Sequence, residues 1–352
     1  MKRELTVSTW RVPTRAGTPQ LRTAPHDRPT PPIPPDNDPT GCNNPTWALR
    51  GSVYLRSTAC IRQDMRINLI QVTDGVPEKV GEADFTVTHG MTLNPTSLAW
   101  SEAITVDPAT LSGAAKDHAI TLQFAVAAPN VSAKVTGDLF NEFTLSDSKP
   151  VTGFVDYSAS PAKTQEILSA SEYYFTGSAA GFVDPINLHY GSEVYRCDDR
   201  FWSKNQDTRL KVPGCVYPFH PGIDEGWIVP SGMAALPGIA NNIRGVQSQG
   251  LHVGMPGSAT LLHRATPEQR AKNYAAVCGG LTPPPGTVLS CDEYPFASTR
   301  EGGLAMNPPN RAIAWVPLPE QKAQGGILRA FYQSNRILPG DPFYVNVDTP
   351  QG

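Results

Sequence analysis

Residues 119–126, AITLQFAV, decide the fold class of the first half of the chain. Every second side chain of this stretch is apolar: Ile120, Leu122, Phe124 and Val126. A β-strand turns alternate side chains to opposite faces, whereas a helix repeats its buried face every three or four residues. The stretch therefore predicts a strand that is buried on one face.

The same period recurs upstream of this strand. In residues 65–72, MRINLIQV, the side chains of Met65, Ile67 and Leu69 fall on one face. An Asp-Gly turn pair follows them. Several short alternating segments with turn residues between them are typical of antiparallel sandwiches. We therefore expect an all-β antiparallel sandwich over residues 42–158.

The segments on either side carry weaker signals. Residues 1–41 include the proline-dense RPTPPIPPDNDPTG and predict an extended tail without a core. The N-terminal MKREL lacks the apolar segment of a secretion signal. Over residues 159–231 we expect a connector that holds a helix at residues 160–174, after the N-cap Ser160, and a solvated loop closed by a disulfide.

From residue 232 onward the apolar residues follow helical periods. Three helices and a closing strand are predicted, over residues 237–250, 266–278, 325–337 and 342–347. The second helix has Thr266 as N-cap and Gln269 in the place that completes a capping box. We expect an α+β domain over residues 232–352.

The composition favours two domains in an oxidising setting. One core usually serves about 100–200 residues, and the chain has 352. Its six cysteines form three local couples, none spaced C-x-x-C, so the pairing 42–60, 197–215 and 278–291 is the simplest framework. Six free thiols are the alternative. Disulfides indicate an extracellular location, and no apolar run reaches the ~20 residues of a membrane helix.

The net charge of −3 is unevenly distributed. Residues 51–230 hold 13 Lys and Arg against 21 Asp and Glu, whereas residues 231–352 hold 9 against 7. A polyanion would therefore meet the C-terminal domain more readily. The difference is too small to predict nucleic-acid binding by itself.

Residues 290–303, SCDEYPFASTREGG, gather the reactive groups of the C-terminal domain. Asp292 and Glu293 are adjacent, Pro295 stiffens the chain after them, and Gly302-Gly303 permits a close backbone approach. Adjacent side chains diverge on a strand, so one carboxylate can bind a metal while the other orients a water or a base. The same residues are also compatible with a solvated turn beside a disulfide.

Residues 291–298, CDEYPFAS, followed by Glu301-Gly302-Gly303, resemble the signature of the NucA/NucB family of secreted bacterial deoxyribonucleases. That signature is an Asp-Glu-aromatic-Pro step with Glu-Gly-Gly or Gln-Gly-Gly a few residues later. Three flanking segments resemble the family in the same order: residues 237–250, 260–270 and 320–347. The resemblance covers residues 232–348, and residues 1–230 resemble no family.

The resemblance implies a secreted, metal-dependent endodeoxyribonuclease that hydrolyses DNA phosphodiester bonds without sequence preference. A divalent cation, Mg²⁺ or Mn²⁺, would neutralise the charge that develops on the phosphate oxygens. The expected partner is DNA, with an immunity or inhibitor protein if the chain is a secreted antibacterial toxin. No membrane partner is expected.

The resemblance and the residue chemistry together imply three sets of site residues. The expected catalytic residues are Asp292, Glu293 and His263, with His263 as general base. The expected metal ligands are Asp292, Glu301, Gln321 and Asn242. The expected substrate contacts are Arg264, Arg329, Arg336 and Gln324. Tyr294 and Phe296 are expected to pack in the core rather than to stack on bases.

Three positions depart from the family pattern. Asn242 stands where the opening helix has a histidine, Ala314 replaces an expected glutamate, and Gln321 replaces an asparagine. Amide oxygens can bind a metal, but they cannot take up a proton. The alternatives are therefore a catalytically silent extracellular binding protein that retains the nuclease scaffold, or the nuclease part of a toxin. The positions of Asn242, His263 and Gln321 relative to Asp292 discriminate between an enzyme and a silent scaffold.

Overall fold

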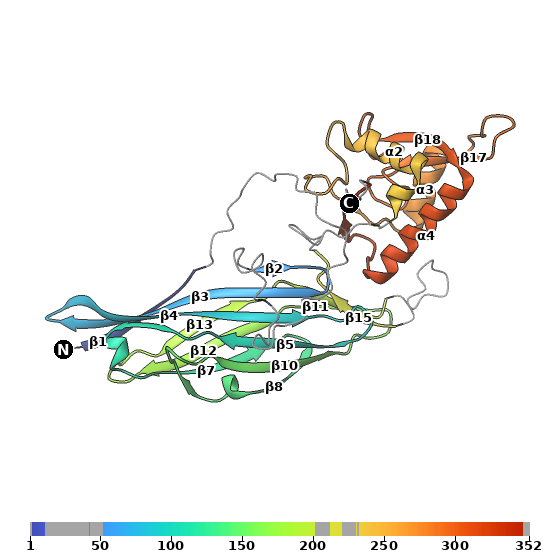
Figure 1. Cartoon of the computed structure of the whole chain (residues 1–352). Coiled ribbons are helices and arrows are strands. Elements are labelled where there is room, and N and C mark those ends of the chain that lie inside the picture. The colour runs from blue at the N-terminus through green and yellow to red at the C-terminus, as the bar shows by residue number, and fades with distance from the viewer. Residues whose placement is uncertain are drawn as a thin grey trace.

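Figure 1 shows the computed structural model, in which a smaller body that contains helices α2, α3 and α4 lies over one end of an elongated body of strands. We name them the β body and the C-terminal body. The structure describes the backbone of residues 2–10, and residues 42, 52–200, 212–219, 230 and 232–347. The proline-dense stretch 28–41 and residues 201–211 of the predicted loop lie outside the described residues. None of the described helices is long and apolar enough to span a membrane.

Two antiparallel sheets form most of the β body. The larger has the strand order β1-β3-β4-β5-β10-β8, with β2 paired to β3 and β6 paired to β4, and the smaller has the order β13-β12-β7-β9. Their bounds are β1 Lys2–Trp10, β2 Val53–Tyr54, β3 Thr58–Thr73, β4 Val76–Thr92, β5 Ala99–Val106, β6 Thr110–Gly113, β7 Ile120–Ala127, β8 Val131–Thr136, β9 Phe143–Thr144, β10 Val151–Ala159, β12 Glu172–Ala179 and β13 Ile186–Gly191, with short 3-10 helices at η1 Ala114–Lys116 and η2 Asp138–Phe140.

Both sheets contribute to one hydrophobic core. The predicted inward face of β3, which carries Met65, Ile67 and Leu69, is fully buried. On β7, Leu122 and Phe124 are buried, whereas Gln123 between them is exposed on the opposite face. The alternating pattern therefore explains why these segments are strands, and the chain is mostly β-structure as predicted. Two sheets share this core, and their arrangement as a sandwich stays a prediction.

Two predictions for this body are wrong. The expected tail contains strand β1, which pairs along its whole length with β3. The expected helix at residues 160–174 contains instead β11, Glu166–Ser169, and the start of β12. Tyr173 and Phe175 alternate into the core and are fully buried. Burial of this alternating face overrides the helix signals of the segment.

A third small sheet, β11-β14-β15, carries one of the disulfides. Cys197 on β14, Tyr195–Asp198, lies opposite Cys215 on β15, Gly214–Val216, and the two are bonded. Both cysteines belong to the core of the β body, which extends as far as Tyr217. Much of the expected connector over residues 159–231 therefore belongs to the β body. The other two predicted disulfides, Cys42–Cys60 and Cys278–Cys291, are also formed.

The C-terminal body contains helices and short strands. Its elements are η3 Met233–Ala235, α2 Pro237–Gln247, β16 Leu262–His263, α3 Pro267–Val277, β17 Leu289–Tyr294, β18 Ala312–Pro317, α4 Leu318–Ser334 and β19 Pro342–Phe343. As predicted, Thr266 caps α3 and accepts a hydrogen bond from the backbone N of Gln269 at 3.2 Å. Helix α4 begins at Leu318 rather than at the expected residue 325, because Pro319 is well suited to a first helical turn.

Helices α2 and α4 pack on the pair β17–β18. The predicted apolar face of α2, formed by Ile239, Ile243 and Val246, is buried in the core of this body. Helix α3 has no buried residue. It is instead tied to strand β17 by the Cys278–Cys291 disulfide. The strand that carries the paired carboxylates is therefore fixed from several directions.

Candidate active site

Strand β17 turns Asp292 and Glu293 to opposite faces. In the β17–β18 ladder, Asp292 lies opposite Ala314 and Glu293 lies opposite Ile313. Directly opposed residues of an antiparallel pair project from the same face, and neighbours along a strand project from opposite faces. Asp292 therefore shares its face with Ala314, under α2 and α4. Glu293 points to the side of Cys278, so the two carboxylates do not share one ligand site.

Two amide side chains hold the Asp292 carboxylate. Nδ2 of Asn242, from α2, donates to Oδ2 at 2.7 Å, and Nε2 of Gln324, from α4, donates to Oδ1 at 2.9 Å. Asp292 is only 1% exposed. Burial raises its pKa to about 6, although both amide donors oppose this shift. Gln324 is thus a buried partner of Asp292 and not the substrate contact that the sequence suggested.

Sequence analysis did not identify Glu320, which lies in the first turn of α4. Its Oε2 accepts hydrogen bonds from the backbone N of Gly238 at 2.8 Å and of Ile239 at 3.2 Å. These amides open α2, which has no side-chain cap of its own, and the first amides of a helix need such acceptors. Glu320 therefore fixes α2 on α4, the two helices that supply Asn242 and Gln324. The late predicted start of α4 concealed this role.

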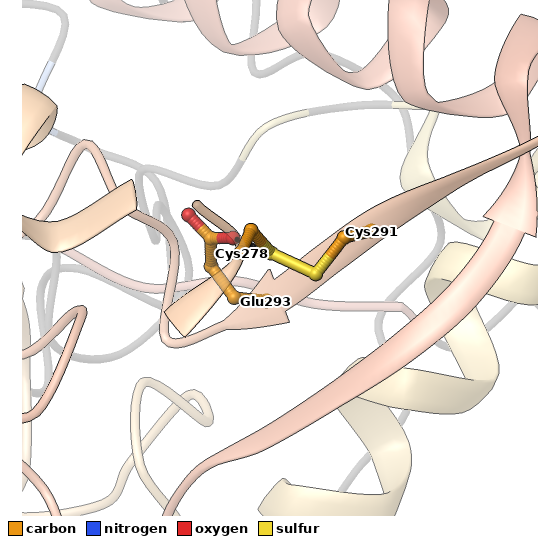
Figure 2. A group of neighbouring side chains, drawn as sticks. All are labelled: Cys278, Cys291 and Glu293. Carbon is orange, nitrogen blue, oxygen red and sulfur yellow. Dashed lines mark hydrogen bonds between the residues drawn. A yellow bond between two sulfur atoms is a disulfide. The ribbon is translucent and has the colours of Figure 1, made fainter. Parts of the chain in front are cut away.

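Glu293 lies against the Cys278–Cys291 disulfide, as Figure 2 shows. Its Oε2 is 2.8 Å from Sγ of Cys278. A disulfide sulfur carries no proton, so a hydrogen bond here requires the protonated carboxyl as donor. Burial and the neighbouring charge of Asp292 raise the pKa of Glu293 to about 7, which favours that form. Cys278, Cys291 and Glu293 lie close together. Because the two cysteines form a disulfide and supply no thiolate, this group is not a metal site.

The raised pKa of Glu293 predicts a loss of stability with rising pH. Its folded-state value of about 7 exceeds the ordinary 4.5, so its stabilisation is complete below that ordinary value and is lost as the pH rises through 7. Between pH 5 and 8.5 we expect the wild type to lose about 2 kcal/mol more free energy of unfolding than Glu293→Gln. Urea unfolding in EDTA measures both losses. Equal losses would contradict a buried, proton-sensitive Glu293.

A second titratable pair lies at β16. Nδ1 of His263 donates to Oε1 of Glu301 at 2.8 Å, and the backbone N of His263 donates to Oε2 at 2.9 Å. This leaves Nε2 of the imidazole as an acceptor, on a side chain that is 34% exposed. Both oxygens of Glu301 accept hydrogen bonds from His263, so Glu301 orients the imidazole, and its expected role as a metal ligand stays a prediction.

Comparison with known proteins identifies the segment that holds these groups. Residues 254–346 match the family Deoxyribonuclease NucA/NucB. The match confirms the resemblance carried by CDEYPFAS and includes Asp292, His263 and Gln324. It starts after Asn242 and leaves out the whole β body. Among curated proteins, none matches the chain.

The aromatic residues of the NucA/NucB signature are structural. The hydroxyl of Tyr294 donates to the carbonyl O of Val253 at 2.8 Å and accepts from Nε2 of Gln247 at 3.0 Å. Phe296 packs edge-to-face on Tyr294, with ring centroids 5.2 Å apart. Both rings are buried. They brace the end of β17 and are not placed to stack on bases.

The glycines of the signature allow the loop after β17 to fold back tightly. A Cβ on Gly302 would collide with the carbonyl O of Phe296, and one on Gly303, whose φ is +65°, would press on Asn273. Asn273 donates from Nδ2 to the carbonyl oxygens of Ala297 and Thr299 at 3.0 and 2.8 Å. Helix α3 therefore holds the loop that delivers Glu301 to His263.

The arginines expected to contact phosphate have different surroundings. Arg329 is exposed on α4. The guanidinium of Arg264 lies 4.7 Å from the ring centroid of Tyr332 and donates to the carbonyl O of Ile337. Arg336 is fully buried and pairs with Asp198 of the β body at 2.8 Å. The prediction that Arg336 contacts phosphate is therefore wrong, since this guanidinium is already occupied inside the protein.

Proposed function

We propose that the C-terminal body is a secreted, metal-dependent endodeoxyribonuclease without sequence preference. The family match supports a nuclease, and the observation that carries the proposal is the buried carboxylate of Asp292 within the matched segment. Among the residues that the structure describes, no cationic side chain forms a salt bridge with Asp292. A buried ionised carboxylate without a counter-charge is costly, and a divalent cation would remove that cost.

The side chains near Asp292 suit a hard divalent cation. Mg²⁺ and Mn²⁺ prefer carboxylate and amide oxygens. Oε1 of Gln321 is buried and has no hydrogen-bond partner among the described residues. Gln321 precedes Gln324 by three positions on α4, so the two lie on neighbouring parts of one helix face. In this proposal Asp292 and Gln321 hold Mg²⁺ or Mn²⁺, and Asn242 and Gln324 orient the carboxylate.

The metal would supply positive charge to the phosphate oxygens. In our proposal His263 accepts a proton at Nε2 from the water that attacks phosphorus, and Glu301 stabilises the imidazolium that results. The P–O bond to one sugar breaks, and the leaving sugar oxygen takes up a proton from solvent. Arg264 and Arg329 hold neighbouring phosphates of the DNA strand. These contacts read the backbone and not the bases, which is why we expect no sequence preference.

A plasmid-cleavage experiment tests the proposal. The disulfide-bonded protein is incubated with supercoiled plasmids of different sequence in Mg²⁺, in Mn²⁺ and in EDTA. We expect nicking and then fragmentation of every plasmid with either metal, and intact plasmid in EDTA. Absence of cleavage in both metals contradicts the proposal. The three disulfides support its extracellular location.

A second function, DNA binding without cleavage, is favoured by one specific observation. Ala314 lies directly opposite Asp292. The glutamate that the family has at this position would therefore lie beside the Asp292 carboxylate, which we propose to bind the metal. The chain lacks that group. The retained scaffold could then bind DNA, and gel shifts without cleavage would reveal this function.

Ala314→Glu distinguishes the two functions. The substitution adds a carboxylate on the face of Asp292, because the Cβ atoms of directly opposed residues lie about 4.5–5.5 Å apart. We expect at least a roughly tenfold rise in the plasmid-cleavage rate, since a second carboxylate strengthens metal binding. Ile313→Glu adds the same charge to the other face and is the control. Cleavage by the variant alone indicates a silent natural chain, and equal rates show that the family glutamate is dispensable here.

A further inference from the structure

Five buried charged residues join the two bodies. Arg56, Arg196 and Asp198 come from the β body, whereas Arg336 and Asp341 come from the C-terminal body. None of them is more than 6% exposed. Groups of this kind are rarely buried unless they are paired, and here every pair but one crosses between the bodies. The contact between the bodies is thus specific and polar.

Asp341 is the main acceptor of this network. Its Oδ1 accepts from Nη1 of Arg196 at 2.7 Å, and its Oδ2 accepts from Nη2 of Arg196 at 3.0 Å and from Nη2 of Arg56. The backbone N of Leu338 also donates to Oδ2, at 3.0 Å. Burial opposes ionisation, but the charges of both arginines hold the pKa of Asp341 below its ordinary value. The β body therefore fixes this side chain as a carboxylate.

Arg336 fixes the turn that leads to Asp341. Its φ is +50°, a conformation that costs energy for a residue other than glycine and persists where surrounding contacts determine it. The contacts come from the β body, since the guanidinium donates to Asp198 and to the carbonyl oxygens of Pro95 and Val212. The backbone of this turn is thus set by residues outside the nuclease segment.

The backbone of the same turn holds the strand that carries His263. The N of Arg264 donates to the carbonyl O of Asp341 at 3.1 Å, and the N of Gly340 donates to the carbonyl O of Arg264 at 2.8 Å. In the β16–β19 pair, His263 lies opposite Pro342. Asp341 therefore meets the β body through its side chain and meets the His263 strand through its main chain.

The loop after β17 holds the other edge of this strand. The backbone N of Arg300 donates to the carbonyl O of His263 at 2.8 Å, and Glu301 binds the imidazole. The strand lies between two fixed segments, one of which is set by the β body. A shift of Asp341 would therefore move His263 relative to Glu301.

We propose that the β body positions His263 for catalysis: Arg56 and Arg196 fix Asp341, and Asp341 fixes the strand that carries the imidazole. The role of His263 as general base rests on the proposed function, whereas the mechanical link does not. Arg56, Arg196 and Asp341 are positioning residues, because they act on His263 through the backbone. The β body is then part of the active unit and not only a separate binding module.

Nuclear magnetic resonance of the histidine ring nitrogens tests the link directly. Protein with ¹⁵N-labelled histidine is compared with Arg196→Lys, and His263→Gln identifies the resonances of His263. Lysine keeps the positive charge but cannot reproduce the paired hydrogen bonds of Arg196 to Asp341. Arg66→Lys is the matched control, since Arg66 makes paired hydrogen bonds to Asp84 at 2.6 Å in a partly exposed position of the β body.

We expect Arg196→Lys to shift the His263 resonances, to reduce the DNA-cleavage rate roughly tenfold and to displace its pH profile, because small misplacements of a catalytic group are costly. Arg66→Lys should change none of these. A folded Arg196→Lys protein with unchanged His263 resonances overturns the proposal. If that variant does not fold, Arg56→Lys replaces it with the same two outcomes. Shifted resonances in a protein whose wild type cuts no DNA retain the link and overturn only the nuclease function.

Discussion

Asparagine in place of Asp292 is expected to reduce the rate of DNA cleavage about a thousandfold. This loss corresponds to several kcal/mol, which is the stabilisation that a metal ion gives to charge in the transition state. The substitution preserves the volume of the side chain, and the amides of Asn242 and Gln324 can rotate to match the new group. Only the negative charge is removed. Rates of plasmid nicking at saturating Mg²⁺ or Mn²⁺ measure the effect, and calorimetric titration with the metal alone measures the loss of binding.

The folded state of Asp292→Asn provides the internal control. The carboxylate is buried and its pKa is raised to about 6, so the wild type carries an unfavourable buried charge at pH 8 in EDTA. The variant should therefore be at least as stable as the wild type at that pH. Asp84→Asn, in the partly exposed ion pair with Arg66 in the β body, should leave cleavage unchanged. Cleavage by Asp292→Asn within twofold of the wild type would remove Asp292 from the metal site.

Asp198→Asn is expected to lower the free energy of unfolding by about 3–5 kcal/mol, the usual cost of removing one partner from a buried ion pair. Asp198 is fully buried and accepts from Arg196 at 3.0 Å and from Arg336 at 2.8 Å. The variant leaves two buried guanidinium groups without their shared carboxylate. Guanidinium unfolding, followed by circular dichroism and by tryptophan fluorescence, measures the change.

Asp84→Asn is again the matched control, because Asp84 forms a similar paired contact with Arg66 at the surface. Exposed pairs contribute about 0–1 kcal/mol. The two asparagine variants should therefore differ by several-fold in their effect on stability. Similar small losses for both would mean that water reaches the contact between the two bodies, and the network would then not be the buried link described above.

Local periodicity was sufficient to predict those strands and helices whose buried side chains recur at a regular spacing along the sequence. Strands β3 and β7 alternate along the sequence, and α2 repeats its buried residues with a helical period. The cap of α3 needs only Thr266 and its neighbour three residues later. The disulfides could be predicted because each joins cysteines that are close in sequence, with separations of 18, 18 and 13.

The centre of the candidate site was predicted in part. The strand alternation that separates Asp292 from Glu293 follows from the residue order, and the family resemblance directed attention to Asp292, Asn242 and His263. The partnership of Gln324 with Asp292 spans 32 residues and depends on how α4 packs. No local pattern records that packing, so Gln324 was assigned to substrate and Glu320 was missed.

The contact between the bodies could not be predicted from the sequence. The sequence of residues 197–215 predicts a solvated disulfide loop, yet Asp198 is fully buried. Its partner Arg336 lies 138 residues further along the chain, so the local sequence gives no sign of the pair. Arg336 in turn reads as a surface arginine in a nuclease. Pairs of opposite charge at such separations have no periodic signature, so each partner resembles an ordinary solvated residue until the fold brings them together.

Strand β1 can be supplied as a separate peptide. Residues 11–52 separate it from β2 in sequence, while its nine residues pair with β3 and lie against β13 at the sheet margin. Main-chain pairing of this kind does not require covalent continuity with the rest of the sheet. A synthetic KRELTVSTW peptide bearing a dye should thus complement a chain truncated before residue 11 and serve as a split-protein reporter of its assembly.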